Sequence, residues 1–236
     1  TYTNDIFPDL ILFWGHNPIY SGPDGELGFG VREALARKPK IIVVDPRKTM
    51  LARRADVWLQ LRPGTDDALA LAMLNVIIEE GLEDRQFVDQ WCHGYEELAQ
   101  RVKAYTPEWA EPITWCSASD IRAAARLYAQ IRPSMLEWGC AIEHTPACFQ
   151  TVRALLCLPS ITGNIDQPGS WSFGMLPLPP FPQLFDKMPA AQQKKRLGFD
   201  DFKVLSGELA QLPSAHVPTI FKAIRSGVPY PVRSGF

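Results

Sequence analysis

The chain contains 236 residues, of which 46% are hydrophobic and 21% charged, and its formal net charge is −2. A chain of this length and apolar content can bury a sizeable core, whereas its near-neutral balance supplies no basic field for nucleic acid. No apolar run approaches the roughly 20 residues that a membrane-spanning helix needs. The composition therefore predicts a globular protein with no membrane span in this segment and no nucleic-acid partner.

Apolar runs alternate with helical patterns along the first part of the chain, which predicts a series of βα units. We expect strands at 9–14, 40–45 and 56–61, and helices at 25–38 and from Thr65 to about residue 80. The second strand is apolar on both faces, which is typical of a parallel strand covered by helices on each side. Thr65 is expected to cap the helix that it precedes.

The region 84–131 has a helical pattern with two internal starts, at Thr106 and at Ser117. Thr106 is followed by a first-turn proline, and Ser117 has an aspartate three residues later, as in a capping box. Both side chains are expected to cap the helices that follow them. A fourth strand is expected at 134–138 and a further helix at 145–162.

Together these elements predict a doubly wound, mainly parallel, Rossmann-like α/β sheet flanked by helices, in a domain covering residues 1–170. The run 175–182 is so rich in proline that it cannot sustain a helix or a central strand. We therefore expect residues 171–236 to form an irregular Pro-rich crossover and the start of an adjoining domain. The alternative is that this run is a polyproline ligand for another protein.

The cysteines form no C-x-x-C pair, so the chain encodes neither a zinc nor a local iron–sulfur motif, and no metal ligand is expected in it. We expect buried free thiols in a reducing compartment, which favours the cytoplasm; the alternative is a periplasmic enzyme exported by a twin-arginine signal. The chain begins with Thr rather than Met and shows no signal peptide, so we expect a fragment of a longer protein. The five cysteines are Cys92, Cys116, Cys140, Cys148 and Cys157.

Small and polar residues follow the first two expected strands. Gly15 and Asn17 come directly after the first strand, where they can approach a pyrophosphate and donate to it. His16 can also donate to a phosphate, although a loop histidine is more often incidental. Asp45 ends the second strand, where open α/β sheets place a carboxylate that binds ribose hydroxyls. The alternative for Asp45 is a turn aspartate that binds its own backbone ahead of Pro46.

Asp66 lies in the first turn of the helix expected after Thr65. Its carboxylate can accept two hydrogen bonds side by side, and the N1–H and N2–H groups of guanine are donors in that arrangement. Gly64 would let the backbone approach a base closely. The alternative is a helix-start aspartate that is favoured only by the helix dipole.

The sequence contains no complete catalytic constellation. It lacks the G-x-S-x-G, H-E-x-x-H and Walker lysine motifs. The remaining histidines are not at ligand spacing. The visible function is therefore binding, and the catalytic residues are unknown.

Short motifs follow one another in a fixed order over residues 5–170. They are Trp14-Gly15-His16-Asn17-Pro18, Val43–Thr49, Ala55-Asp56, Arg62–Asp66, Trp138-Gly139 and Thr162–Gly169. This succession resembles the molybdopterin oxidoreductases of the dimethyl-sulfoxide-reductase superfamily. Members of that superfamily include formate dehydrogenases, nitrate, polysulfide and thiosulfate reductases, and acetylene hydratase.

The resemblance implies a large enzyme with two pyranopterin guanine dinucleotides around one molybdenum or tungsten atom. It also implies a 4Fe-4S cluster held upstream of this chain, and it makes this chain the domain that binds one of the dinucleotides. The implied contacts are with the pyrophosphate, the ribose, the guanine and the metal-facing part of the cofactor. The residues implied to bind it are Gly15, His16, Asn17, Asp45, Arg47, Gly64, Asp66 and Gly139.

The same resemblance places the loop after Gly139 opposite the metal centre. It makes Glu143 and His144 catalytic candidates, and it puts the metal's own protein ligand upstream of Thr1. Cys140 is accordingly expected to pack behind a turn rather than to bind the metal.

The implied partners are the remaining domains of the same chain, an iron–sulfur electron-transfer subunit and a small-molecule substrate. The substrate is expected to be of the formate, nitrate, sulfur-oxyanion or polysulfide type. Three alternatives stay open: a non-redox member such as a hydratase, an NAD-dependent dehydrogenase, and a cofactor-free α/β scaffold subunit. The dehydrogenase needs a glycine fingerprint after the first strand, which Gly15–Pro18 does not supply.

Overall fold

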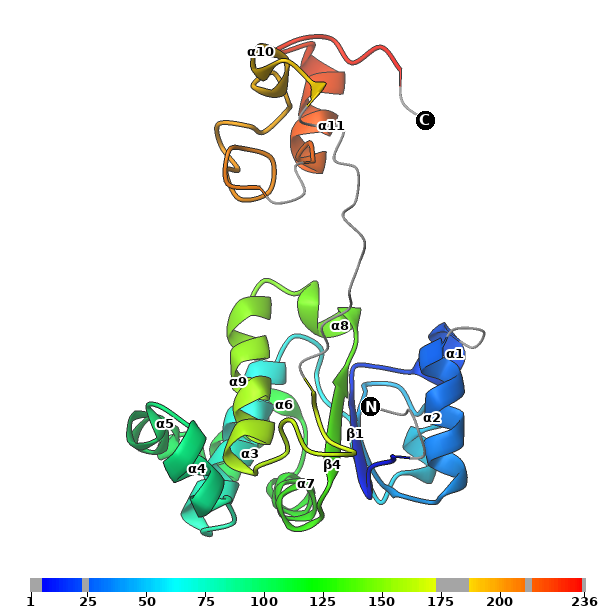
Figure 1. The fold of residues 1–236 in the computed structure, drawn as a ribbon, viewed down its shortest axis with the longest axis vertical. Helices are drawn as coiled ribbons and strands as arrows, with labels where there is room; N and C mark the ends of the chain where they lie inside the picture. The colour runs from blue at the N-terminus through cyan, green and yellow to red at the C-terminus, as the bar shows by residue number, and fades with distance from the viewer. Residues whose placement is uncertain (1–5, 23–25, 173–186, 211–213, 235–236) are drawn as a thin grey trace. The chain divides into compact units, whose positions relative to one another are not determined.

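The computed structural model describes residues 6–22, 26–172, 187–210 and 214–234 (Figure 1). The chain divides into two compact units, unit 1 (Thr1–Gly174) and unit 2 (Met175–Phe236). The sequence places this boundary after residue 170. The proline-dense run 175–182, and with it the expected crossover, lies outside the described residues.

Unit 1 is built on a parallel sheet with the strand order β3-β2-β1-β4. Strand β1 (Leu10–Trp14) pairs with β2 (Lys40–Val44) and with β4 (Ser134–Trp138), and β2 also pairs with β3 (Val57–Leu59). The expected α/β fold with a mainly parallel sheet is confirmed. Strand β3 is shorter than expected because the chain turns away from the sheet after Leu59. The Arg62 amide donates to the Thr114 carbonyl at 2.7 Å rather than to a neighbouring strand.

Helices cover both faces of the sheet, as expected for a doubly wound fold (Figure 1). One face is covered by α2 and the other by α3, α7 and α9, while α4, α5 and α6 pack around α3 and α9. The helices of unit 1 are α1 (Pro18–Ser21), α2 (Glu26–Ala36), the 3-10 turn η1 (Ala52–Arg54), α3 (Asp66–Glu79), α4 (Arg85–Trp91), α5 (Tyr95–Val102), α6 (Pro107–Thr114), α7 (Ala118–Gln130), α8 (Cys140–Glu143) and α9 (Cys148–Ile161).

Strand β1 contributes to both hydrophobic cores of unit 1, and all of its side chains are fully buried. Leu10, Leu12 and Trp14 belong to the core shared with α3, α7 and α9. Ile11 and Phe13 belong to the core on the α2 side. Successive side chains of a strand point to opposite faces, so an uninterrupted apolar strand is stable only when both faces are covered.

Two of the three expected helix caps are confirmed. The Thr106 and Ser117 hydroxyls each accept a hydrogen bond from the amide three residues later, at 3.2 and 3.1 Å. Thr65 is the N-cap residue of α3, as expected, but its side chain makes no capping hydrogen bond. Its hydroxyl donates to the Arg62 carbonyl at 2.7 Å and so is turned away from the helix.

The loop after β4 also differs from expectation. A short helix, α8, precedes α9, and α9 begins at Cys148 rather than at Thr145. The Thr145 hydroxyl donates to the Ile142 carbonyl at 3.2 Å, so this threonine closes α8 and cannot start α9. A four-residue helix has too few residues to show a periodic pattern, which is why the sequence did not indicate it.

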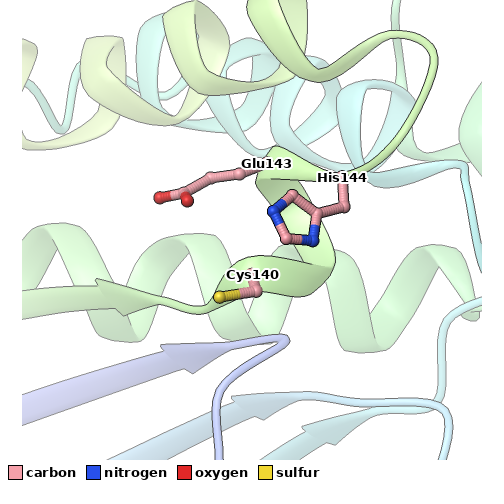
Figure 2. Close-up of side chains that lie close together, drawn as sticks. All are labelled: Cys140, Glu143 and His144. Carbon is pink, nitrogen blue, oxygen red and sulfur yellow. The ribbon is translucent and has the colours of Figure 1, made fainter. Parts of the chain in front are cut away.

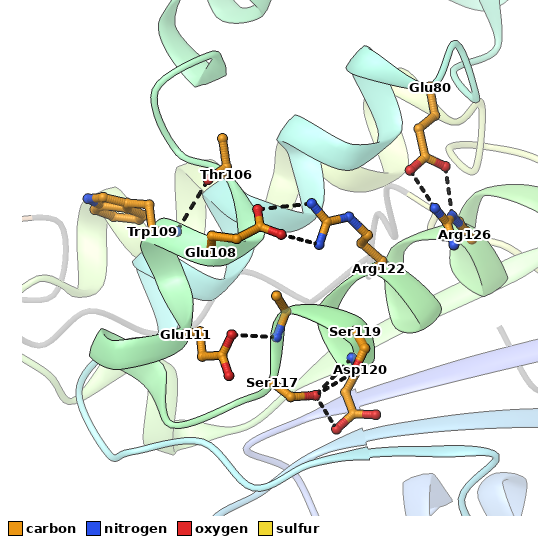
Figure 3. A network of polar contacts seen from close by, with 11 residues as sticks. Glu80, Thr106, Glu108, Trp109, Glu111, Ser117, Ser119, Asp120, Arg122 and Arg126 are labelled. Atoms are coloured by element: carbon orange, nitrogen blue, oxygen red, sulfur yellow. Dashed lines mark hydrogen bonds and ion pairs between the residues drawn. The ribbon is translucent and has the colours of Figure 1, made fainter.

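Ion pairs join the exposed sides of α3, α6 and α7 (Figure 3). Arg122 contacts Glu108 at 2.7 Å and Arg126 contacts Glu80 at 2.7 Å. The hydrogen bonds from Arg122 lower the pKa of Glu108 to about 2. Exposed pairs of this kind contribute little to stability, so the buried core remains the main source of unit 1's stability.

Asp84 joins the start of α4 to the segment of the same chain that precedes β4. Its carboxylate accepts from the Phe87 amide at 3.0 Å and pairs with the Arg132 guanidinium. The Phe87 amide and the Arg132 charge hold the pKa of Asp84 below its ordinary value of 3.8. A carboxylate with a lowered pKa stabilises the folded state above that ordinary value, and this contribution is lost as the pH falls through the lowered pKa.

We expect Asp84→Ala to lower the free energy of unfolding at neutral pH by about 1–2 kcal/mol, because it removes a helix cap. Urea unfolding of the two proteins at pH 7 and in acid, below the lowered pKa, measures the difference. The difference should shrink in acid, where the carboxyl is protonated in both states. Asp89→Ala is the control, since Asp89 is an exposed α4 residue whose ion-pair partner is Arg85; an equal loss in that variant would contradict the capping role.

Within its described residues, unit 2 contains α10 (Ala190–Gln193) and α11 (Val217–Ser226). Ala223 of α11 is buried, whereas Phe221 and Ile224 are exposed. In neither unit do the described ranges hold a helix with the length and apolar character needed to cross a bilayer.

Candidate functional site

The order of the strands reverses at β1. From β1 the chain moves to β2 and β3 on one side, and it returns to β4 on the other. The carboxyl ends of β1 and β4, with the loops that follow them, are called the switch point below. Open α/β sheets bind ligands at such a position, because the two loops diverge there.

Two glycines allow the loops of the switch point to touch. Gly15 has a φ of +56°, which favours glycine, and its amide donates to the Val44 carbonyl at 2.8 Å. The Gly139 amide donates to the Trp14 carbonyl at 3.2 Å. A Cβ at Gly139 would lie 2.6 Å from the Gly15 carbonyl oxygen, so no other residue fits without movement of the backbone.

A groove with several cationic side chains lies between the loops that follow β1 and β2. Asn17 comes from the first loop, and Arg47, Lys48 and Arg53 come from the second or from η1. The sequence indicated Asn17 and Arg47 but not Lys48 or Arg53. Guanidinium and ammonium groups bind phosphate through charge-assisted hydrogen bonds, so this groove suits an anion.

Asp45 lies at the carboxyl end of β2 and is 4% exposed. Its Oδ1 accepts from the Arg47 amide at 2.7 Å, which is the turn geometry of the alternative interpretation. The Arg47 side chain is 75% exposed, with its Nε 3.6 Å from the same oxygen. Within the described part of the chain no hydrogen bond is made by Oδ2, so a turn role leaves one oxygen of Asp45 available to a ligand.

Asp66 starts α3 and is 7% exposed. Its Oδ1 accepts from the indole N–H of the fully buried Trp14 at 2.9 Å, which ties the start of α3 to the end of β1. Burial raises the pKa of Asp66, and the Trp14 hydrogen bond opposes that rise. Gly64 has a φ of +83° and open space where a Cβ would stand. Asp66 thus also joins α3 to the core, and its carboxylate has a desolvation cost that a solvated helix-start carboxylate does not have.

Three enclosed polar atoms near the switch point have no hydrogen-bond partner among the described residues. They are Nδ1 of His16, Oδ1 of Asn17 and Oε2 of Glu137. His16 and Asn17 were predicted to bind a cofactor, whereas Glu137 was not. The signal for Glu137 was available, because it is the one charged residue in the otherwise apolar and small run 134–138.

The loop after β4 brings together Cys140, Glu143 and His144, one potential metal-binding atom of each lying within 4.8 Å of the others (Figure 2). All three side chains are exposed. Glu143 also accepts from the Trp138 indole at 3.1 Å, and that indole stacks on Trp171 with 5.7 Å between ring centroids. The Trp138 ring therefore holds Glu143 at the base of this loop.

The cysteines are free thiols, but the expectation that all are buried is wrong. Cys116 is buried, and burial raises the pKa of its thiol to about 11, so it is inert at neutral pH. Cys140 is exposed at the first position of α8 and does not pack behind a turn. The short helix α8, which the sequence did not indicate, turns this side chain outward.

The structure thus brings most of the predicted residues to one edge of the sheet. Gly15, His16 and Asn17 follow β1, Asp45 and Arg47 follow β2, and Gly139 follows β4. Asp66 is held near this edge by its hydrogen bond with Trp14, the last residue of β1. Each lies at the carboxyl end of a strand or at the start of a helix that faces it, which is where a parallel sheet places its ligand-binding groups.

Comparison with known proteins identifies the family of this chain. The family model described as molybdopterin oxidoreductase matches residues 7–214. Acetylene hydratase of Syntrophotalea acetylenica is 35% identical over 229 residues, which cover 87% of this chain and 31% of that protein. Formate dehydrogenase H of Escherichia coli (strain K12) is 43% identical over 160 residues, which cover 68% of this chain and 22% of that protein.

A solved structure is also similar over nearly the whole chain. The acetylene hydratase from Pelobacter acetylenicus superimposes with a TM-score of 0.74 and 30% sequence identity, covering 99% of this chain and 34% of that one. The chain therefore spans about a third or less of the length of the relatives it matches. The expected resemblance is confirmed, and the chain belongs to the molybdopterin oxidoreductase family.

Proposed function

We propose that the chain binds the guanosine and pyrophosphate portion of a molybdopterin guanine dinucleotide at the carboxyl edge of its sheet. The observation that carries this proposal is the convergence of a cationic groove and buried, partly unpartnered polar groups at that edge. Buried polar atoms are nearly always hydrogen-bonded in proteins. The enclosed Oδ1 of Asn17 has no partner among the described residues, and a donor on the ligand, such as a ribose hydroxyl, would supply one.

The groove between the first two loops would hold the pyrophosphate. Arg47, Lys48 and Arg53 supply positive charge, Asn17 supplies an amide, and Gly15 lets the backbone come close. His16 lies beside them at the switch point. This set suits a diphosphate group better than a neutral ligand, because guanidinium and ammonium groups form charge-assisted hydrogen bonds with phosphate oxygens.

The two carboxylates would recognise the nucleoside. The free oxygen of Asp45 is suited to ribose hydroxyls, and the carboxylate of Asp66 to the two N–H donors of guanine. Gly64 leaves open space beside Asp66 for a flat base. Since adenine has no pair of N–H donors on that edge, a carboxylate there would favour guanine.

The loop that carries Gly139, Glu143 and His144 would face the metal end of the cofactor. When bound, molybdenum or tungsten would supply the redox or Lewis-acid chemistry. The residues of this chain would hold the cofactor in position and limit the access of water to it. In the proposal the intact protein is an oxidoreductase with a 4Fe-4S cluster, further domains of the same chain and an iron–sulfur electron-transfer subunit. Its substrate would be of the formate, nitrate, sulfur-oxyanion or polysulfide type.

The composition of the intact gene product tests the proposal. Acid hydrolysis is expected to release about two guanosine monophosphates per chain, and elemental analysis to find about one molybdenum or tungsten atom. About four iron atoms would match the proposed cluster. A folded protein that contains neither guanine nor heavy metal would contradict the proposal and would favour the cofactor-free scaffold.

A second candidate activity is hydration rather than redox transfer. The match to acetylene hydratase covers 87% of the chain, which is more than unit 1 contains, whereas the match to formate dehydrogenase H covers 68%. Of these two matches, only the one to acetylene hydratase is too long to lie within unit 1, so it extends into unit 2. Two assays of the intact, metal-loaded protein separate the candidates: formation of acetaldehyde from acetylene and water, and formate-dependent reduction of a dye.

A further inference from the structure

Glu137 is a half-buried carboxylate in a strand that is otherwise apolar or small. It lies on β4 directly opposite Phe13 of β1, and its side chain is 10% exposed. Its Oε2 is enclosed and has no hydrogen-bond partner among the described residues. A buried charge is costly unless another group compensates it, so a compensating group is expected close by.

His16 is that group. Its Nδ1 lies 3.4 Å from Oε2 of Glu137, and its side chain is 17% exposed. The backbone of Gly139 packs against the other side of the ring, since a Cβ there would lie 3.2 Å from Cδ2 of His16. The imidazole thus lies between Gly139 and Glu137, with Nδ1 in ion-pair range of the carboxylate but without a hydrogen bond to it.

A carboxylate beside one ring nitrogen of a histidine determines which nitrogen carries the proton and what the other can do. With Nδ1 beside the carboxylate of Glu137, Nε2 is the ring nitrogen left for a ligand. A bound anion stabilises the imidazolium, whose Nε2–H then donates to it.

We propose that Glu137 is a positioning residue that acts through His16, holding the ring so that Nε2 presents a proton to a phosphate group of the bound nucleotide. This inference rests on the proposed function and deepens it, because it adds a residue that acts on the nucleotide through a neighbouring side chain. Glu137 itself does not touch the ligand.

A double-mutant cycle tests the pairing, with GDP as the probe and the full 236-residue chain in the calorimeter. Glu137→Gln and His16→Gln are each expected to weaken GDP binding about tenfold, the loss of one charge-assisted hydrogen bond. The double variant should bind no more weakly than His16→Gln alone, since groups that act together are not additive. Glu33→Gln, which removes an exposed carboxylate of α2, is the matched control and should bind as the parent does.

A spectroscopic readout separates positioning from a loss of structure. The ¹⁵N shifts of the His16 ring should show a protonated Nδ1 in the parent and a changed tautomer in Glu137→Gln. If that variant folds poorly, Glu137→Met removes the buried charge at similar volume and should give the same loss of affinity. Unchanged GDP affinity, or losses that add in the double variant, would overturn the pairing alone. A parent protein that binds no GDP would overturn the proposed function as well.

Discussion

If Asp66 binds guanine as proposed, replacing it with asparagine is expected to weaken GDP binding by the chain by at least about tenfold, since one of the two charge-assisted hydrogen bonds would be lost. Asparagine keeps one acceptor oxygen but replaces the other with an NH₂ group, which faces the donors of guanine unfavourably. The free energy of unfolding at neutral pH should not fall. The amide oxygen can still accept from the Trp14 indole, and the cost of burying a charge disappears.

Calorimetry with GDP and with ADP measures this effect, and urea unfolding measures stability in the same samples. The preference for GDP over ADP should be lost in Asp66→Asn. Asp67→Asn is the matched control, because Asp67 lies in the same helical turn but is less buried. Equal losses in the two variants, or a preserved preference for guanine, would rule out Asp66 as the guanine-binding carboxylate.

Replacing Trp14 with phenylalanine is expected to lower the free energy of unfolding at neutral pH by about 2–4 kcal/mol. Part of the loss comes from the smaller ring in a fully buried position. The rest comes from Asp66, whose enclosed carboxylate loses the indole donor at 2.9 Å. Urea unfolding of both proteins at neutral pH measures the sum.

The pH dependence separates these two contributions. Burial already raises the pKa of Asp66 above its ordinary value of 3.8, and removal of the Trp14 donor raises it further. A raised carboxyl pKa destabilises the folded state above that pKa and has no effect below the unfolded value. The loss caused by Trp14→Phe should therefore shrink in acid, toward the part caused by packing alone.

The Asp66→Asn background provides the control for that change. There Trp14→Phe should cost less at neutral pH, and its cost should vary little with pH, because no buried carboxyl remains at that position. A loss that is the same at neutral and acid pH in both backgrounds would show that the Trp14–Asp66 contact has no electrostatic role. Trp14 and Asp66 would then stabilise the fold through packing alone.

The Trp14–Asp66 contact also links the core to the candidate site. Trp14 ends β1 and is fully buried, while Asp66 starts α3 and carries the proposed guanine-binding carboxylate. The side chain proposed to recognise the base is thus held by the strand on which the sheet is built. Groups held by rigid elements keep their geometry better than groups on free loops.

The sequence by itself determined the class of fold and the identity of most candidate residues. The residues of β1 and β2 are almost all apolar, so neither face of these strands can be exposed to water. They therefore predict strands that are covered by helices on both sides. The glycines and carboxylates that follow those strands mark the edge at which a ligand would bind. The succession of motifs was sufficient to predict the family.

Only the tertiary structure decided which of these groups meet and what each one contacts. Asp66 and Trp14 are separated by 52 positions, and no local pattern indicates that the indole donates to the carboxylate. Glu137 and His16 likewise become neighbours only because β4 pairs with β1. The physical reason is that periodicity reports how a segment is buried, whereas the partner of a buried charge is set by strand order and register.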